Sequence, residues 1–196
     1  TYSLNMVSIK NGIISNNGEV VELTKEENFE TNPIQVSEIV SSDVGNVGYL
    51  MYNQFVATKS NDLNKIFAEF KTTGIIDLVI DLRYNGGGSV RNCVELASMI
   101  TGQLTGEVFS NELWNSKLDA YFLEKYGSDS QKNRFVNVLS DGEPINSLEL
   151  NRVFILTTSE SASASELLIT GLAPLIEVIH IGEQTVGKNV GSITVY

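Results

Sequence analysis

The side chains that could do covalent chemistry in this chain are a run of serines and a single lysine downstream of them. Ser159, Ser161, Ser163 and Ser165 occupy alternate positions, and Lys188 follows Ser163 by 25 residues. A serine hydroxyl becomes a nucleophile when a base takes its proton, and a lysine can be that base once burial makes it neutral. Uncharged residues flank Lys188 on both sides, which favours burial. The pattern indicates a Ser163 nucleophile with a Lys188 base.

The same residues also have plain structural explanations. Ser163-x-x-Glu166 matches a capping box, in which the serine only begins a helix. Lys188 taken alone would be a solvated loop lysine. His180 is the only histidine and lies in an apolar run, so we expect it in the sheet or core; a Ser-His-Asp triad would need it. Tertiary structure has to decide between these alternatives.

Apolar periodicity predicts the elements that would position these side chains. A strand, helix, strand order with an almost continuously apolar second strand predicts a parallel pair buried on both faces. A helix, a third strand and another helix follow, and the serine run lies at the start of a later helix between two further strands. The expected ranges are strands at 47–55, 75–82, 106–114, 153–157 and 177–181, and helices at 61–70, 89–100, 118–126 and 164–172.

A glycine-rich turn follows the apolar strand that ends near residue 82. Gly86, Gly87 and Gly88 permit positive φ and leave backbone N–H groups uncovered, so the turn could donate hydrogen bonds to an oxyanion. The Ala164 N–H at a helix start is a second candidate donor. A nucleotide loop is the weaker interpretation, because neither GxGxxG nor GxxxxGK[ST] is present. We expect Asp81 and Arg83 to form a structural ion pair beside this turn.

The first part of the chain has a different pattern. Strand-like runs at 2–9 and 20–23, separated by Asn-Gly turns, and at 34–39, after a polar loop, predict antiparallel β structure. We therefore expect an α/β (α+β) protein with an N-terminal β segment, residues 1–46, packing on a core of residues 47–196. The polar stretch 127–147 is long for a connection inside a compact domain, which predicts a lid or insertion.

Composition excludes several classes of protein. The net charge of -11 over 196 residues argues against a nucleic-acid surface and gives no reason to expect an anionic membrane, so we expect protein or small-molecule partners. No apolar run approaches the roughly 18 residues of a membrane span, and no targeting segment is visible. Cys93 cannot form an internal disulfide, and we expect it in the core. No cluster has metal-ligand spacing, so we predict no metal and no cofactor.

Three segments, in order, resemble the signatures of the carboxyl-terminal processing (tail-specific) serine peptidase family. They are DLVIDLRYNGGG at 77–88, SASASE at 161–166 and GEQTVGKN at 182–189, and the likeness covers roughly residues 47–196. The resemblance implies a crotonase-like or Clp-protease-like core of stacked ββα units. It implies a serine endopeptidase that cleaves proteins near exposed carboxyl-terminal tails through an acyl-enzyme. It also implies an extracytoplasmic location, in a periplasm or cell envelope.

The resemblance further implies roles for individual residues. Ser163 corresponds to the family nucleophile and Lys188 to its base, and the amides of Ala164 and Gly87 correspond to the oxyanion donors. Where many members have a Gln or Glu four residues after the lysine, this chain has Ser192, whose hydroxyl would orient Lys188 more weakly. Members usually carry a PDZ domain; we find no segment with that pattern and expect it upstream of Thr1 or removed.

Two other functions remain open from the sequence. A non-catalytic peptide-binding module of the same fold is one, and Ser192 is the hint for it. A crotonase-type acyl-CoA enzyme is the other; it would share the glycine-rich turn, but it needs a carboxylate base and has no use for Ser163 with Lys188. A fluorophosphonate probe separates them, because it labels only a working Ser/Lys site.

Overall fold

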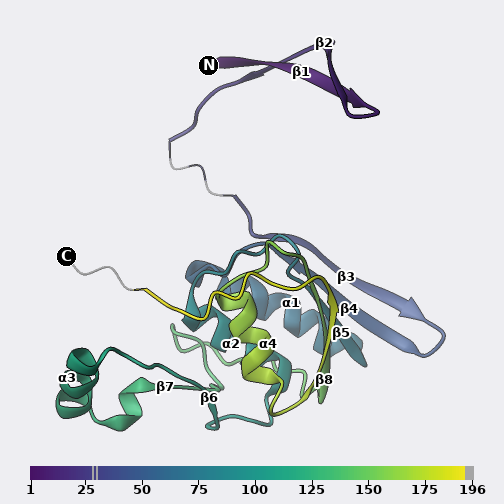
Figure 1. The fold of residues 1–196 in the computed structure, drawn as a ribbon. Coiled ribbons are helices and arrows are strands. Elements are labelled where there is room, and N and C mark those ends of the chain that lie inside the picture. The colour runs from purple at the N-terminus through teal and green to yellow at the C-terminus, as the bar shows by residue number, and fades with distance from the viewer. Residues whose placement is uncertain (28, 30, 193–196) are drawn as a thin grey trace. The chain divides into compact units, whose positions relative to one another are not determined.

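The computed structural model describes residues 1–27, 29 and 31–192, and contacts divide the chain into two units, Thr1–Asn32 and Pro33–Tyr196 (Figure 1). The first unit is an antiparallel hairpin of β1 (Tyr2–Lys10) and β2 (Ile13–Leu23). Its turn contains Asn11 and Gly12, both with positive φ, as a two-residue hairpin turn requires.

A five-stranded mixed sheet forms the centre of the second unit. The strand order is β3-β4-β5-β8-β9, in which only the β3–β4 pair is antiparallel. Central strand β5 is buried at four of its five positions, as expected for a parallel strand covered on both faces. The α/β class is therefore confirmed. The bounds are β3 (Ile34–Ser42), β4 (Gly45–Tyr52), β5 (Asp77–Asp81), β8 (Arg152–Thr157) and β9 (Glu177–Gly182).

Three helices connect the parallel strands. Helices α1 (Ser60–Thr73), α2 (Val90–Thr101) and α4 (Ala164–Leu172) follow β4, β5 and β8. Because parallel crossovers are right-handed and the strands are ordered along the chain, the helices share one face of the sheet. Figure 1 shows them together on that side, and α2 packs against both α1 and α4. The buried core between the layers includes Leu50, Tyr52, Phe67, Leu78, Ile80, Leu96, Ile155 and Leu168.

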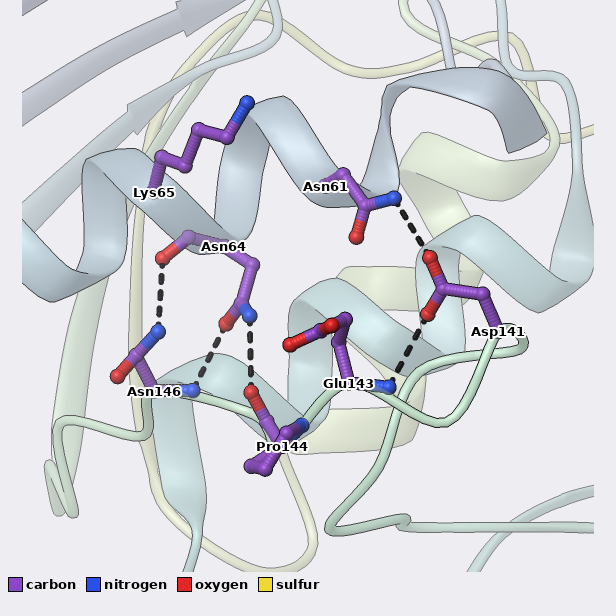
Figure 2. A pocket seen from close by; sticks show the side chains of 7 residues that line it. All are labelled: Asn61, Asn64, Lys65, Asp141, Glu143, Pro144 and Asn146. Atoms are coloured by element: carbon purple, nitrogen blue, oxygen red, sulfur yellow. Dashed lines mark hydrogen bonds between the residues drawn. The ribbon is translucent and has the colours of Figure 1, made fainter.

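The stretch between α2 and β8 is largely irregular. It contains β6 (Val108–Asn111), α3 (Ser116–Tyr126), a 3₁₀ turn at Ser128–Gln131 and β7 (Lys132–Arg134), and a second 3₁₀ turn, Ala57–Lys59, precedes α1. Further along, Asn64 of α1 donates to the Pro144 carbonyl and accepts from the Asn146 N–H (Figure 2). These bonds line a polar pocket of about 640 Å³ that includes none of the predicted site residues. That residues 127–147 form a lid stays a prediction.

The boundary between the two parts differs from the one expected. The sequence placed it after residue 46, whereas the contacts place it after Asn32. The reason is that β3 pairs with β4 along its length, from Ile34 opposite Tyr52 to Ser42 opposite Gly45, and so belongs to the core sheet. Packing of the N-terminal hairpin on the core stays a prediction. Among the described residues, no helix is both long and apolar enough to cross a membrane.

Candidate functional site

Three segments leave the sheet at the same edge. Strands β5, β8 and β9 run parallel, with Asp81 beside Leu156 and Thr157 beside Gly182. The glycine-rich turn after β5, the serine-rich turn after β8 and the loop after β9 therefore all begin at this edge. Parallel pairing brings together segments that are up to about a hundred residues apart in the chain.

The serine-rich turn separates its serines by role. Ser161 Oγ donates to the Leu82 carbonyl at 2.7 Å, and Ser165 Oγ donates to the Asn85 carbonyl at 2.8 Å; both serines are fully buried. Ser163 is only half-buried, and no described residue accepts its hydroxyl proton. Two of the four serines thus fasten the serine turn to the glycine turn, and Ser163 keeps a free hydroxyl proton.

Ser163 also lies at a strained point of the backbone. Its φ of 58° is in the left-handed region, which costs a non-glycine residue about 1 kcal/mol or more. It is the N-cap of α4 and has capping-box geometry with Glu166, although only the Ser163 N–H to Glu166 Oε2 half, at 2.7 Å, makes a full hydrogen bond. The capping interpretation is therefore correct, and it leaves the hydroxyl proton of Ser163 without an acceptor among the described residues.

The glycine turn lies directly against Ser163. A Cβ built on Gly87, whose φ is 105°, would lie 2.7 Å from Ser163 Cβ and 2.9 Å from the Ala164 nitrogen. No described residue accepts from the Ala164 N–H. The Gly87 N–H instead donates to Asn85 Oδ1 at 2.8 Å, so an oxyanion at this position would have to share or displace that bond.

An ion pair between the exposed Arg83 side chain and the buried Asp81 carboxylate lies just before the glycine turn in the chain. Arg83 Nη2 lies 2.7 Å from Asp81 Oδ2, and the Tyr49 hydroxyl donates to the same oxygen at 2.6 Å. Burial of the Asp81 carboxyl would raise its pKa, but the hydrogen bonds from Arg83 and Tyr49 outweigh burial and lower it. The expected Asp81–Arg83 pair is confirmed. The Thr158 hydroxyl donates to the Arg83 carbonyl and joins this pair to the serine turn.

Lys188 is placed differently from the expectation. It is exposed rather than buried, because its loop is held by backbone hydrogen bonds that leave the side chain outside. Within the described part of the chain, no hydrogen bond joins Lys188 Nζ to Ser163 Oγ. Ser192 is also exposed, and no hydrogen bond between described atoms connects it with Lys188.

The Lys188 backbone, in contrast, is close to the serine. Its N–H donates to Glu166 Oε2 at 2.9 Å, and the Ser163 N–H donates to the same oxygen at 2.7 Å. The two nitrogens therefore lie within about 5.6 Å of each other. The flexible four-carbon stem of lysine can span such a distance.

His180 and Cys93 occupy structural positions. His180 lies on β9, with Nε2 at 2.5 Å from Thr157 Oγ1. That hydroxyl donates to the Glu183 carbonyl, so His180 Nε2 is the donor in their hydrogen bond. Cys93 is fully buried, and burial raises the pKa of its thiol well above the ordinary value, which makes it unreactive. The prediction that Cys93 belongs to the core is confirmed.

Two residues that shape the site were not predicted. Glu166 appeared in the sequence only as half of a capping box, and its contacts with the Lys188 loop cannot be read from that spacing. Asn85 is fully buried and holds the glycine turn through its side chain, which donates to the Tyr52 carbonyl at 2.8 Å and accepts from Gly87. An asparagine within a glycine turn was the only available signal.

Comparison with known proteins gives related sequences and folds. A carboxyl-terminal-processing protease of Picosynechococcus sp. is 28% identical over 142 residues, covering 72% of this chain and 29% of the relative. Carboxyl-terminal-processing peptidase 1, chloroplastic, of Arabidopsis thaliana is 24% identical over 168 residues, covering 86% of this chain and 30% of the relative. The chain thus spans about 30% of the length of these curated relatives.

Solved structures with a similar fold include proteases. A chain from Bacteroides fragilis NCTC 9343, named as a candidate S41 protease, superposes with a TM-score of 0.72 at 25% identity, covering 96% of this chain and 49% of that one. The photosystem II D1 C-terminal processing protease superposes with a TM-score of 0.58 at 21% identity, covering 87% of this chain and 41% of its own, which shows a shared fold. The predicted family resemblance is confirmed: the family model for Peptidase family S41 matches residues 46–195, and this chain belongs to that family.

Proposed function

We propose that this chain is the catalytic part of a serine endopeptidase that cleaves proteins near their carboxyl-terminal tails. The observation that carries the proposal is the free hydroxyl of Ser163, next to Gly87 and at the start of α4, while Ser161 and Ser165 are fixed by hydrogen bonds. Membership of the S41 family and the names of the curated relatives support the same reaction.

In the proposed mechanism, neutral Lys188 takes the proton from Ser163 Oγ, which attacks the scissile carbonyl and forms an acyl-enzyme that water then hydrolyses. The Ala164 N–H and, once released from Asn85, the Gly87 N–H stabilise the oxyanion. The mechanism requires the Lys188 side chain to turn inward from its exposed position, and the nearby Lys188 backbone makes this a side-chain rotation. Ser192 would support Lys188 in that position.

A non-catalytic peptide-binding module of the same fold is the second candidate. The exposure of Lys188 and the lack of any described hydrogen bond to Ser163 favour it.

The endopeptidase proposal also includes substrates with exposed carboxyl termini, a separate PDZ domain and an extracytoplasmic location. The chloroplastic location named for the Arabidopsis thaliana relative refers to that protein alone.

Covalent labelling with a fluorophosphonate tests the proposed function. The chain should be labelled at Ser163 alone, and Ser163→Ala and Lys188→Ala should each abolish labelling while the fold is retained. The double variant should be no worse than either single one, because two residues that act as a unit lose their effect only once. Ser161→Ala is the control, since it removes a buried structural hydroxyl from the same turn. An unlabelled but folded parent chain would support the peptide-binding module instead.

A further inference from the structure

One carboxylate joins the backbones of the two residues of the proposed dyad. Glu166 Oε2 accepts from the N–H of Ser163 and from the N–H of Lys188, at 2.7 and 2.9 Å. Its Oε1 accepts from the N–H of Gly187 at 2.5 Å. Three backbone donors from two separate segments therefore converge on a single side chain.

Helix capping does not explain this convergence. In a capping box the glutamate side chain accepts only from the N-cap N–H, here that of Ser163, three residues before Glu166. The donors from Gly187 and Lys188 come from a loop that lies 21 and 22 residues further along the chain. A carboxylate accepts hydrogen bonds through both oxygens and donates none, so it can take all these donors at once. Charge-assisted bonds of this kind are about twice as strong as bonds between neutral groups.

The other contacts of the loop do not fix Lys188. The Val186 N–H donates to the Ser161 carbonyl at 3.0 Å, and Glu183 accepts from the Ser159 N–H at 3.1 Å, so both hold earlier parts of the loop. Ser192, the residue expected to orient Lys188, makes no hydrogen bond with it among the described atoms. Among the described residues, Glu166 is the side chain that connects the Lys188 backbone to Ser163.

We propose that Glu166 is a positioning residue for the Ser163–Lys188 dyad, which holds the Lys188 loop against the start of α4 so that the lysine side chain can reach the serine hydroxyl. This inference rests on the proposed function. It assigns the support of Lys188 to Glu166 on α4, whereas the sequence led us to expect that support from Ser192. Glu166 touches no reacting atom in this scheme.

The Glu166→Gln variant separates helix capping by Glu166 from its contacts with the Lys188 loop. The carbonyl oxygen, in the place of Oε2, can still accept from the Ser163 and Lys188 N–H groups, whereas the new NH₂ group, in the place of Oε1, meets the Gly187 N–H as a donor facing a donor. We expect α4 to stay folded, by circular dichroism and with a thermal midpoint within about 5 °C of the parent. The maximal rate of fluorophosphonate labelling should fall by about 10- to 100-fold, because a misplacement of about 1 Å costs this much. The probe concentration at half-maximal rate should change less than about threefold.

Amide hydrogen exchange provides a readout that does not need activity. The Gly187 amide donates to the oxygen that Glu166→Gln replaces by NH₂, so it should exchange about tenfold faster or more in this variant, while amides within α4 keep their protection. Glu160→Gln is the matched control: it removes the same charge from the same turn, on an exposed side chain. We expect parent values for Glu160→Gln in both measurements.

The outcomes separate this inference from the proposed function. Labelling of Glu166→Gln at the parent rate, or equal slowing by Glu160→Gln, would overturn the positioning role. Unchanged exchange at Gly187 would overturn it as well. If the parent chain is not labelled at all, the proposed function fails, and the exchange experiment alone decides whether Glu166 holds the loop.

Discussion

Gly87 is the position where one added methyl group should disturb the candidate site most directly. An alanine Cβ there would lie 2.7 Å from Ser163 Cβ and 2.8 Å from the Ala162 carbonyl oxygen, distances that real Cβ atoms essentially never show. The φ of 105° adds strain that any L side chain would feel. Gly87→Ala must therefore move either the glycine turn or the serine turn.

The magnitude follows from these two contributions. Backbone strain in a sparsely populated region costs about 1–3 kcal/mol, and overpacking costs about 1–3 kcal/mol. We expect the free energy of unfolding to fall by about 2–6 kcal/mol, measured by urea denaturation. Because the turn also carries a proposed oxyanion donor, fluorophosphonate labelling of Ser163 should slow by about 100-fold or more under folding conditions.

Gly86 provides the matched control for this substitution. A Cβ at Gly86 meets no atom within 4 Å, and its φ lies outside the left-handed region. Gly86→Ala should therefore leave stability unchanged or raise it by about 0.4–1 kcal/mol, and should be labelled like the parent. If Gly87→Ala unfolds at the same urea concentration as Gly86→Ala and is labelled at the parent rate, the close contact between the glycine turn and Ser163 is not real.

Three more predictions concern the Asp81–Arg83 pair, His180 and the pH dependence of stability. Arg83→Met should lower the free energy of unfolding by about 2–3 kcal/mol in urea, because it leaves the fully buried Asp81 carboxylate without its cation; a loss below about 0.5 kcal/mol would mean that the pair contributes nothing. His180→Gln should keep labelling within about tenfold, since His180 Nε2 binds Thr157, whereas a loss of about 10⁴ with the fold retained would favour a Ser-His triad. The pKa values of Asp81 and Glu166 are lowered in the folded chain, so the stabilisation that they provide is present above their ordinary pKa of about 4 and is lost as the pH falls through the folded values. The urea midpoint should thus fall below about pH 4, and less steeply in Asp81→Asn; equal slopes would contradict the assignment.

The sequence by itself determined the order of the elements and the turns that carry the candidate chemistry. Apolar periodicity predicted the parallel strands and their helices, because burial on one or two faces imposes a local repeat. The helix start at Ala164 and the Ser163–Glu166 cap were predicted for a similar reason, since their partners are three residues apart. The Asp81–Arg83 pair is also local and was predicted correctly.

Only the tertiary structure decided how these parts meet. Ser161 and Ser165 bind carbonyls 79 and 80 residues away, so no local pattern could show that their hydroxyls are engaged and that of Ser163 is not. The exposure of Lys188 and its backbone bond to Glu166 likewise depend on how the loop after β9 returns to α4. The pairing of β3 with the core sheet was likewise not visible in the sequence, because strand pairing, unlike periodicity, depends on the neighbour that the fold supplies.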